Sequence, residues 1–199
     1  MASIKLNTLS LSAIAGGLLL SMLAPQVQAH GYMDSPKARQ AFCQDDGGYW
    51  WPEDGTNIPN LACRSAYLES GTVQFVQAIE FSVNTPDYLN QTAVEASVPN
   101  GTLCAGGDTA KRGMDLPSPH WQRSDVVPNA NGEIQVRYLA STPHNPSFWQ
   151  FYLTKPTFNA ATDVLNWQDL ELVQEHQNVD VIKDTDGERY YQMSVAIPF

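Results

Sequence analysis

Residues 131–140 read NGEIQVRYLA and give the clearest structural pattern in the chain. Asn131-Gly132 is a dipeptide that favours tight hairpin turns, and the run after it alternates between apolar and polar side chains. Residues 148–153 (FWQFYL) and 190–197 (YYQMSVAI) are two more short runs of this kind, each next to a cluster of turn residues. We therefore expect three antiparallel strands in these segments.

Turn-rich sequence surrounds the predicted strands. Residues 30–61 are rich in Gly, Pro, Asp and aromatic residues, and residues 84–128 contain many turn dipeptides, so we expect loops there. A short helix is expected near residues 64–69, while residues 167–173 fit either a strand or one helical turn. The predicted fold is mostly β, an immunoglobulin/fibronectin-like antiparallel β-sandwich with a large loop or helical insertion.

The first 29 residues have the pattern of a secretory signal peptide. A lysine precedes an apolar, small-residue run at 9–24, and Val27-Gln28-Ala29 places small or modest side chains where a signal peptidase cleaves. A transmembrane anchor is disfavoured, because the run is shorter than the roughly 20 apolar residues that a span needs. We expect residues 30–199 to form one secreted domain, with residues 1–29 removed.

The charge balance excludes two classes of partner. The chain has 21 Asp and Glu residues against 11 Lys and Arg residues, a net charge of −10. Nucleic acids and anionic membranes would be repelled by such a surface, so neither is an expected partner. An uncharged polymer is compatible with this charge, and we expect the protein to be a monomer.

Cleavage after Ala29 would make His30 the first residue of the mature protein. A histidine in that position offers two nitrogen donors, its ring and its α-amine, which together chelate a metal ion. One further histidine would complete a roughly planar three-nitrogen site, which suits copper better than the tetrahedral preference of zinc. The alternative is that a histidine follows the cleavage site by chance.

Two separated motifs favour the metal-binding interpretation of His30 over a chance histidine. Residues 30–33 (HGYM) and 35–39 (SPKAR) resemble the opening of auxiliary activity family 10, the bacterial and viral lytic polysaccharide monooxygenases, also called type-4 chitin-binding domains. Residues 142–144 (TPH), Trp149 and residues 152–156 (YLTKP) are similar to the segment around the second histidine of that family.

The resemblance implies that His30 and His144 hold one copper ion. It also implies that an external electron donor, with O2 or H2O2, drives oxidative cleavage of an insoluble polysaccharide. Chitin is the favoured substrate and cellulose the second candidate. Ordinary glycoside hydrolysis is disfavoured, because no motif singles out the pair of carboxylates that it requires.

The resemblance also points to a substrate surface. Tyr49, Trp50 and Trp51 lie in a Gly- and Pro-rich loop, where exposed rings would stack on sugar faces beside the copper. We expect one of the three rings to be core and favour Trp50 for substrate. Glu53 is the candidate for the family's acidic residue near the metal, and a solvated loop carboxylate is the alternative.

The chain has three cysteines, Cys43, Cys63 and Cys104. Export to an oxidising compartment favours disulfides, and we expect Cys43 to pair with Cys63 because the two flank one loop. The family continues beyond the strand matched by residues 190–197 into a further strand that often carries a cysteine. The resemblance therefore implies that the C-terminal strand is missing after Phe199, with a redox role for Cys104 as the alternative.

Two other functions stay open at the level of sequence. One is a non-catalytic chitin-binding protein or adhesin, and the other is a periplasmic copper carrier that uses the same N-terminal chelate. The remaining histidines have no role in the resemblance: His120 would be an equal candidate ligand without it, and we expect His176 to be a solvated surface residue.

Overall fold

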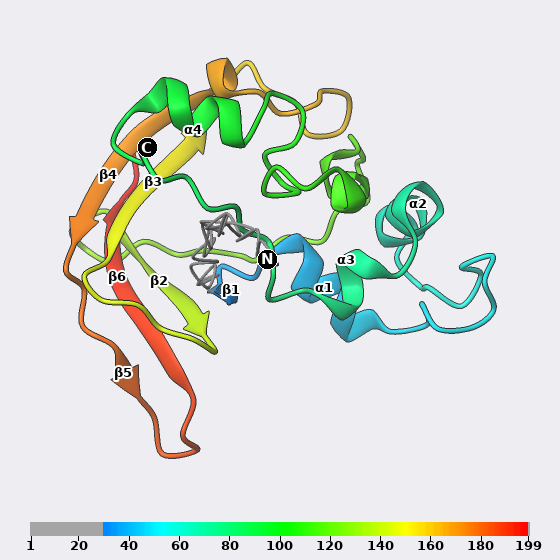
Figure 1. Cartoon of the computed structure of the whole chain (residues 1–199), viewed down its shortest axis with the longest axis horizontal. Coiled ribbons are helices and arrows are strands. Elements are labelled where there is room, and N and C mark those ends of the chain that lie inside the picture. Colours follow the sequence, from blue (N-terminus) through cyan, green and yellow to red (C-terminus); the bar gives the residue numbers. More distant parts are fainter. Residues whose placement is uncertain (1–29, 199) are drawn as a thin grey trace, which may run out of the picture.

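A β-sandwich occupies one side of the molecule and a lobe of short helices the other (Figure 1). The computed structural model describes residues 30–198, so the predicted signal peptide lies outside the described residues. The strands are β1 (Gly31–Ser35), β2 (Glu133–Ala140), β3 (Phe148–Thr154), β4 (Leu170–Gln177), β5 (Ile182–Lys183) and β6 (Arg189–Ala196). One sheet has the order β1-β2-β6-β5 and the other pairs β3 with β4, and every strand pair is antiparallel.

Alternating side chains fill the space between the sheets. On β6 the side chains of Tyr191, Met193 and Val195 are buried, while their neighbours are more exposed. Val136 on β2 pairs with Met193 and joins the same core. This period-2 burial confirms the strands predicted from NGEIQVRYLA and YYQMSVAI, and it confirms the antiparallel β-sandwich.

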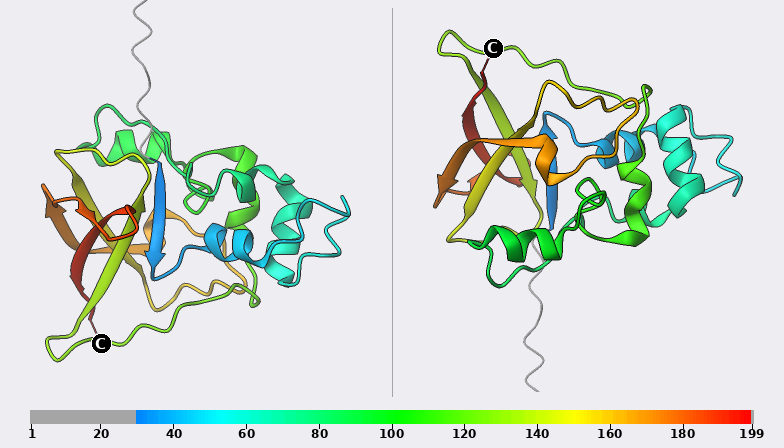
Figure 2. Two further views of the ribbon diagram at one scale, coloured as in Figure 1. Left: turned by 90° about the horizontal axis from the view of Figure 1, so that it is seen from below. Right: turned by 90° about the horizontal axis from the view of Figure 1, so that it is seen from above.

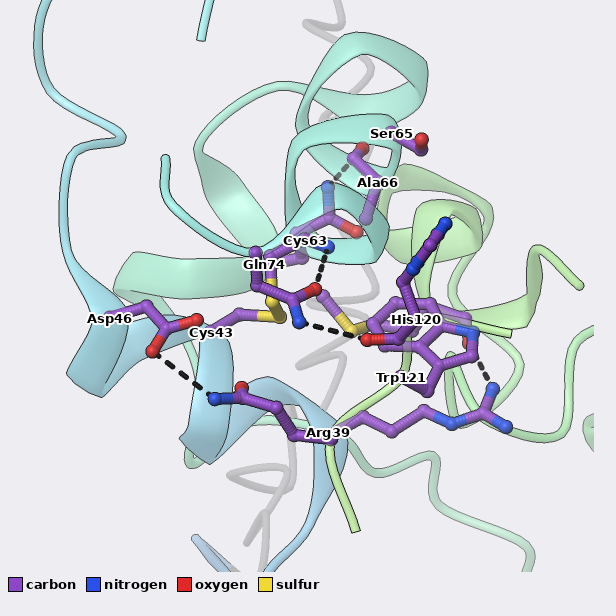
Figure 3. The surroundings of a disulfide bond; sticks show 12 residues. Arg39, Cys43, Asp46, Cys63, Ser65, Ala66, Gln74, His120 and Trp121 are labelled. Atoms are coloured by element: carbon purple, nitrogen blue, oxygen red, sulfur yellow. Dashed lines mark hydrogen bonds between the residues drawn. A yellow bond between two sulfur atoms is a disulfide. The ribbon is translucent and has the colours of Figure 1, made fainter. Parts of the chain in front are cut away.

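The helical lobe has a core of its own. It contains α1 (Arg39–Asp46), α2 (Leu61–Ser70), α3 (Val73–Val76) and the 3-10 helix η1 (Thr109–Asp115), while α4 (Gln91–Ser97) and the 3-10 turn η2 (Trp167–Asp169) lie nearer the sandwich. The expected Cys43–Cys63 disulfide joins α1 to α2 (Figure 3). Phe75, Met114 and Trp121 are buried around it. Within the described residues, no helix is long and apolar enough to cross a membrane.

Residues 30–61 were predicted to be a loop, and there the structure differs. The segment contains β1 and α1. The N-cap of α1, Ala38, makes no side-chain capping bond, so little in the local sequence favours a helix. Burial of Gln40, Ala41 and Cys43 against the lobe stabilises it instead. Similarly, β1 exists because it pairs with β2, a strand distant along the chain, with Gly31 opposite Ala140.

Candidate metal centre

His30 stands immediately before β1 and is held against the end of β2. Its carbonyl oxygen accepts hydrogen bonds from the Ser141 backbone N–H (3.0 Å) and hydroxyl (3.1 Å). The next residue, Gly31, donates its N–H to the Ile79 carbonyl at 2.8 Å. A Cβ on Gly31 would collide with the Leu139 carbonyl oxygen, so this close approach of β1 to β2 requires glycine. The His-Gly pair of the sequence motif thus has a packing reason.

A carboxylate lies beside the His30 ring, and it belongs to Glu80. Its Oε1 is 3.9 Å from His30 Nε2, and Glu80 also forms a parallel β-bridge with Gly31. Glu53, the acid that the sequence favoured, is exposed in the loop between α1 and α2, and Figure 1 shows that this loop projects away from β1. The carboxylate that the structure brings beside the His30 ring is thus that of Glu80, and no spacing in the sequence links residue 80 to residue 30.

His144 lies in the connection between β2 and β3. The Tyr191 hydroxyl on β6 accepts a hydrogen bond from the His144 backbone N–H (2.9 Å) and donates one to the His144 carbonyl (2.7 Å). The ring nitrogen Nε2 of His144 is buried and has no hydrogen-bond partner among the described residues. A buried ring nitrogen without a partner is rare in native proteins and is expected where an absent ligand belongs.

A pocket of about 260 Å³ opens beside His144. Trp149 lines it together with Tyr138 and Tyr191, and its ring centroid lies 5.1 Å and 4.8 Å from theirs, respectively. Burial raises the pKa of Tyr138 to about 12, so its hydroxyl stays protonated at neutral pH. The aromatic rings make this a weakly polar setting next to His144, in which electrostatic interactions are strengthened.

The two histidine side chains fit a metal ion only if a main-chain nitrogen serves as a further ligand. Among residues 30–198, no three His, Cys, Asp or Glu side chains converge to hold a metal ion. The structure does bring His30 and the loop that carries His144 to the same end of the β1–β2 pair. The two imidazole rings would then need a third nitrogen to complete the metal site. Cleavage before His30 would free its α-amine, which is adjacent to the His30 ring. Three nitrogens of this kind suit copper.

The aromatic loop has a different position from the one expected. Trp50 is 68% exposed and Trp51 72% exposed, whereas Tyr49 is buried and stacks on Phe75 at 5.1 Å. Tyr49 is therefore the ring of the three that belongs to the core, which corrects its assignment to the substrate surface. In Figures 1 and 2 the loop between α1 and α2 projects away from the start of β1, so these tryptophans do not lie beside His30.

The tryptophan loop is well anchored despite its exposure. The Asn57 side-chain amide donates to the Trp51 carbonyl at 2.9 Å. The Arg64 guanidinium donates to the carbonyls of Thr56 and Ile58, both at 2.8 Å. With the disulfide at its base, the loop presents two flat rings on a fixed support.

The other two histidines stand outside this site. His176 is half-buried, and its Nε2 lies 3.0 Å from both the Gln174 amide and the Ser194 carbonyl oxygen, so the predicted solvated position is wrong. His120 is exposed.

Cys104 is a free thiol among the described residues and packs against the disulfide core. Burial raises the pKa of the Cys104 thiol, which disfavours the reactive thiolate. Arg39, whose guanidinium lies over the Trp121 ring (Figure 3), approaches the sulfur at 3.5 Å. The thiol is thus part of the packing of the lobe, as an inert buried cysteine would be.

Comparison with known proteins agrees with this geometry. Residues 30–199 match the family described as lytic polysaccharide mono-oxygenase, cellulose-degrading. Spindolin of Choristoneura biennis entomopoxvirus is 30% identical over 187 residues, which cover 78% of this chain and 54% of spindolin. Chitin-binding protein CbpD of Pseudomonas aeruginosa is 34% identical over 156 residues, which cover 77% of this chain and 37% of CbpD. The chain thus spans about half or less of the length of these relatives.

Solved structures show the same fold. Fusolin from spindles of Anomala cuprea entomopoxvirus superposes with a TM-score of 0.72 at 31% identity, covering 85% of this chain and 78% of fusolin. A cellulose-active lytic polysaccharide monooxygenase in complex with copper superposes with a TM-score of 0.64 at 26% identity, covering 85% of this chain and 83% of that one. The family model covers every residue from His30 to Phe199 and the sandwich superposes on a member of the family, so the chain belongs to the auxiliary activity family 10 lytic polysaccharide monooxygenases.

Proposed function

We propose that this protein is a secreted, copper-dependent monooxygenase that binds insoluble polysaccharide and cleaves it oxidatively. The observation that carries the proposal is the position of His30, Glu80 and His144 at one end of the β1–β2 pair, where His144 Nε2 is buried and no residue from 30 to 198 bonds to it. Chitin is the preferred substrate, because a chitin-binding relative is 34% identical, whereas the cellulose-active structure is 26% identical.

His30 would bind the metal through its freed α-amine and its ring, and His144 would supply the third nitrogen. Copper in that position would supply the one-electron chemistry that activates O2 or H2O2 with an external electron donor. The Glu80 carboxylate, 3.9 Å from the His30 ring, would hold a proton or a water molecule next to that site. Tyr191 would keep the His144 backbone in place while substrate binds.

The experiment compares two forms of the protein, one that begins at His30 and one that retains Ala29 before it. Each is loaded with copper and incubated with β-chitin and ascorbate, and the products are identified by mass spectrometry. Oxidised oligosaccharides are expected only from the form that begins at His30, because a peptide bond removes the α-amine from the donor set of the other. No oxidised product from either form, or equal yields from both, would contradict the proposal.

A non-catalytic chitin-binding protein is the second candidate. The observation that favours it is the exposed pair Trp50 and Trp51, which forms a stacking surface away from His30. Such a surface would bind polysaccharide without any metal. Retention of the metal-free protein on chitin, together with an absence of oxidised products from the copper-loaded form, would favour this function over the first.

A further inference from the structure

A second groove lies next to the His144 pocket and has no role in the site described so far. It has a volume of about 570 Å³, which falls within the range of small-ligand sites, roughly 300–1,000 Å³. One wall comes from the segment that leads into α4, and the other from the start of β3 and the end of β4. Figure 2 shows α4 running beside the turn that enters β3.

Flat apolar surfaces line one side of this groove. Tyr88 is 53% exposed and Leu89 is 73% exposed, although both are large apolar side chains. The Tyr88 ring lies 5.8 Å from the Phe148 ring at an angle of 47°, so the two rings present adjoining faces. Aromatic faces of this kind pack against the C–H faces of sugar rings.

Amide side chains also line the groove. Gln177 is the last residue of β4, Asn178 follows it, and both line the groove. The Gln150 amide is held in place, since it donates to Glu175 at 2.7 Å and accepts from the Tyr152 hydroxyl at 3.2 Å. Amides offer both donors and acceptors, which is what hydroxyl and acetamido groups require.

The lining carries no charge. Every described residue of the groove is neutral, so the groove has no cation for an anionic ligand and no carboxylate for a metal ion. A ligand with hydroxyls, flat apolar faces and no charge suits this combination of rings and amides. A sugar chain has these properties, whereas a ligand without polar groups would leave the amides unpaired.

The groove adjoins the pocket beside His144. Pro146, Ser147 and Phe148 line both the groove and the His144 pocket. The segment that supplies Tyr88 also supplies Glu80 beside His30, eight residues earlier in the chain. A chain bound in the groove would therefore lie beside the His144 pocket.

We propose that this groove, lined by Tyr88, Leu89, Phe148, Gln177 and Asn178, binds a short stretch of a single neutral polysaccharide chain next to the metal centre. The proposal rests on the proposed function for the identity of the polymer, a β-1,4-linked polymer of N-acetylglucosamine. It adds a subsite for a chain end or a loosened chain to the site that the proposed function assigns to insoluble polysaccharide.

The test is calorimetric titration of the metal-free exported protein with the soluble hexasaccharide of N-acetylglucosamine. Tyr88→Ala is expected to weaken binding about tenfold, since a lost aromatic contact of ~1.4 kcal/mol corresponds to that factor. Leu89→Ala should weaken it several-fold. Leu68→Ala is the matched control, because Leu68 is also exposed (65%) but lies on α2. The affinity of this variant for the hexasaccharide should equal that of the wild type.

Absence of hexasaccharide binding to the wild type would overturn the proposal, and so would binding that Tyr88→Ala and Leu89→Ala leave unchanged. Binding of an apolar peptide in place of the sugar would overturn it as well. The metal-free design separates this proposal from the proposed function. Oxidised products without groove binding would refute the subsite alone, whereas groove binding without oxidised products would refute the monooxygenase alone.

Discussion

The Tyr191 hydroxyl fixes the backbone of His144 through two hydrogen bonds, one accepted from its N–H at 2.9 Å and one donated to its carbonyl at 2.7 Å. Tyr191 lies on β6, 47 residues after His144, and its ring is buried against Trp149. The sandwich core therefore determines where a histidine in a connecting loop stands. Such support around a metal ligand reduces the freedom of its ring and raises affinity.

Tyr191→Phe should weaken copper binding by about 10-fold or more, because supporting residues around metal ligands typically contribute that much. The loss of two hydrogen bonds should also lower the free energy of unfolding by about 1–3 kcal/mol. Calorimetric copper titration and urea denaturation measure the two effects. Tyr190→Phe is the matched control, since the Tyr190 hydroxyl has no hydrogen bond among the described residues; a similar loss in both variants would contradict the role of Tyr191.

Glu80→Gln should lower the rate of oxidised product formation on the order of 100-fold, because an amide cannot hold and release a proton as a carboxylate does. Copper affinity should change little, since Glu80 lies beside the His30 ring and is not one of the three nitrogen donors. Product analysis on β-chitin measures the rate. Glu53→Gln is expected to retain the wild-type rate. A lower rate in Glu53→Gln alone would contradict the role of Glu80 and favour Glu53, the acid that the sequence indicated.

Replacing both Trp50 and Trp51 by alanine should weaken retention on β-chitin about tenfold, which corresponds to the loss of ~1.4 kcal/mol of stacking. Copper affinity and stability should be preserved, because both rings are exposed and lie away from His30. Depletion of protein from solution by chitin measures retention. Undiminished retention would show that the loop makes no contribution to substrate binding.

Asp115 predicts a pH dependence of stability. Burial raises the pKa of Asp115 from 3.8 to about 6, although the backbone N–H groups of Cys104 and Ala105 donate to its carboxylate. The folded state thus binds the proton more tightly than the unfolded chain does. The stabilisation that protonated Asp115 provides is complete below about pH 4 and is lost as pH rises through about 6.

The stability advantage of the wild type over Asp115→Asn should therefore shrink as pH rises from 4 to 7, as measured by urea denaturation at several pH values. Asp163→Asn is the control. The Asn159 backbone N–H lowers the pKa of Asp163, so that carboxyl stays ionised in the folded state and its variant should show no growing or shrinking difference as pH rises toward 7. A constant difference for Asp115→Asn as well would contradict the effect of burial.

Much of the sandwich could be predicted from local sequence. The segment at residues 133–140 alternates apolar and polar side chains, and this pattern alone specifies both a strand and its buried face. The disulfide between Cys43 and Cys63 could also be predicted from the sequence, since the two cysteines flank one loop. The helix α1 was not predictable, because burial of Ala41 and Cys43 stabilises it and its N-cap makes no side-chain bond.

By itself, the sequence determined the candidate metal ligands His30 and His144, because each lies in a short motif of contiguous residues. Only the tertiary structure decided which side chains surround them. Glu80 reaches His30, and Tyr191 reaches His144, across separations that no local pattern records. The same packing places Trp50 and Trp51 far from the site. Contacts between distant segments depend on how the sheets and the lobe close, and that closure is a property of the whole chain.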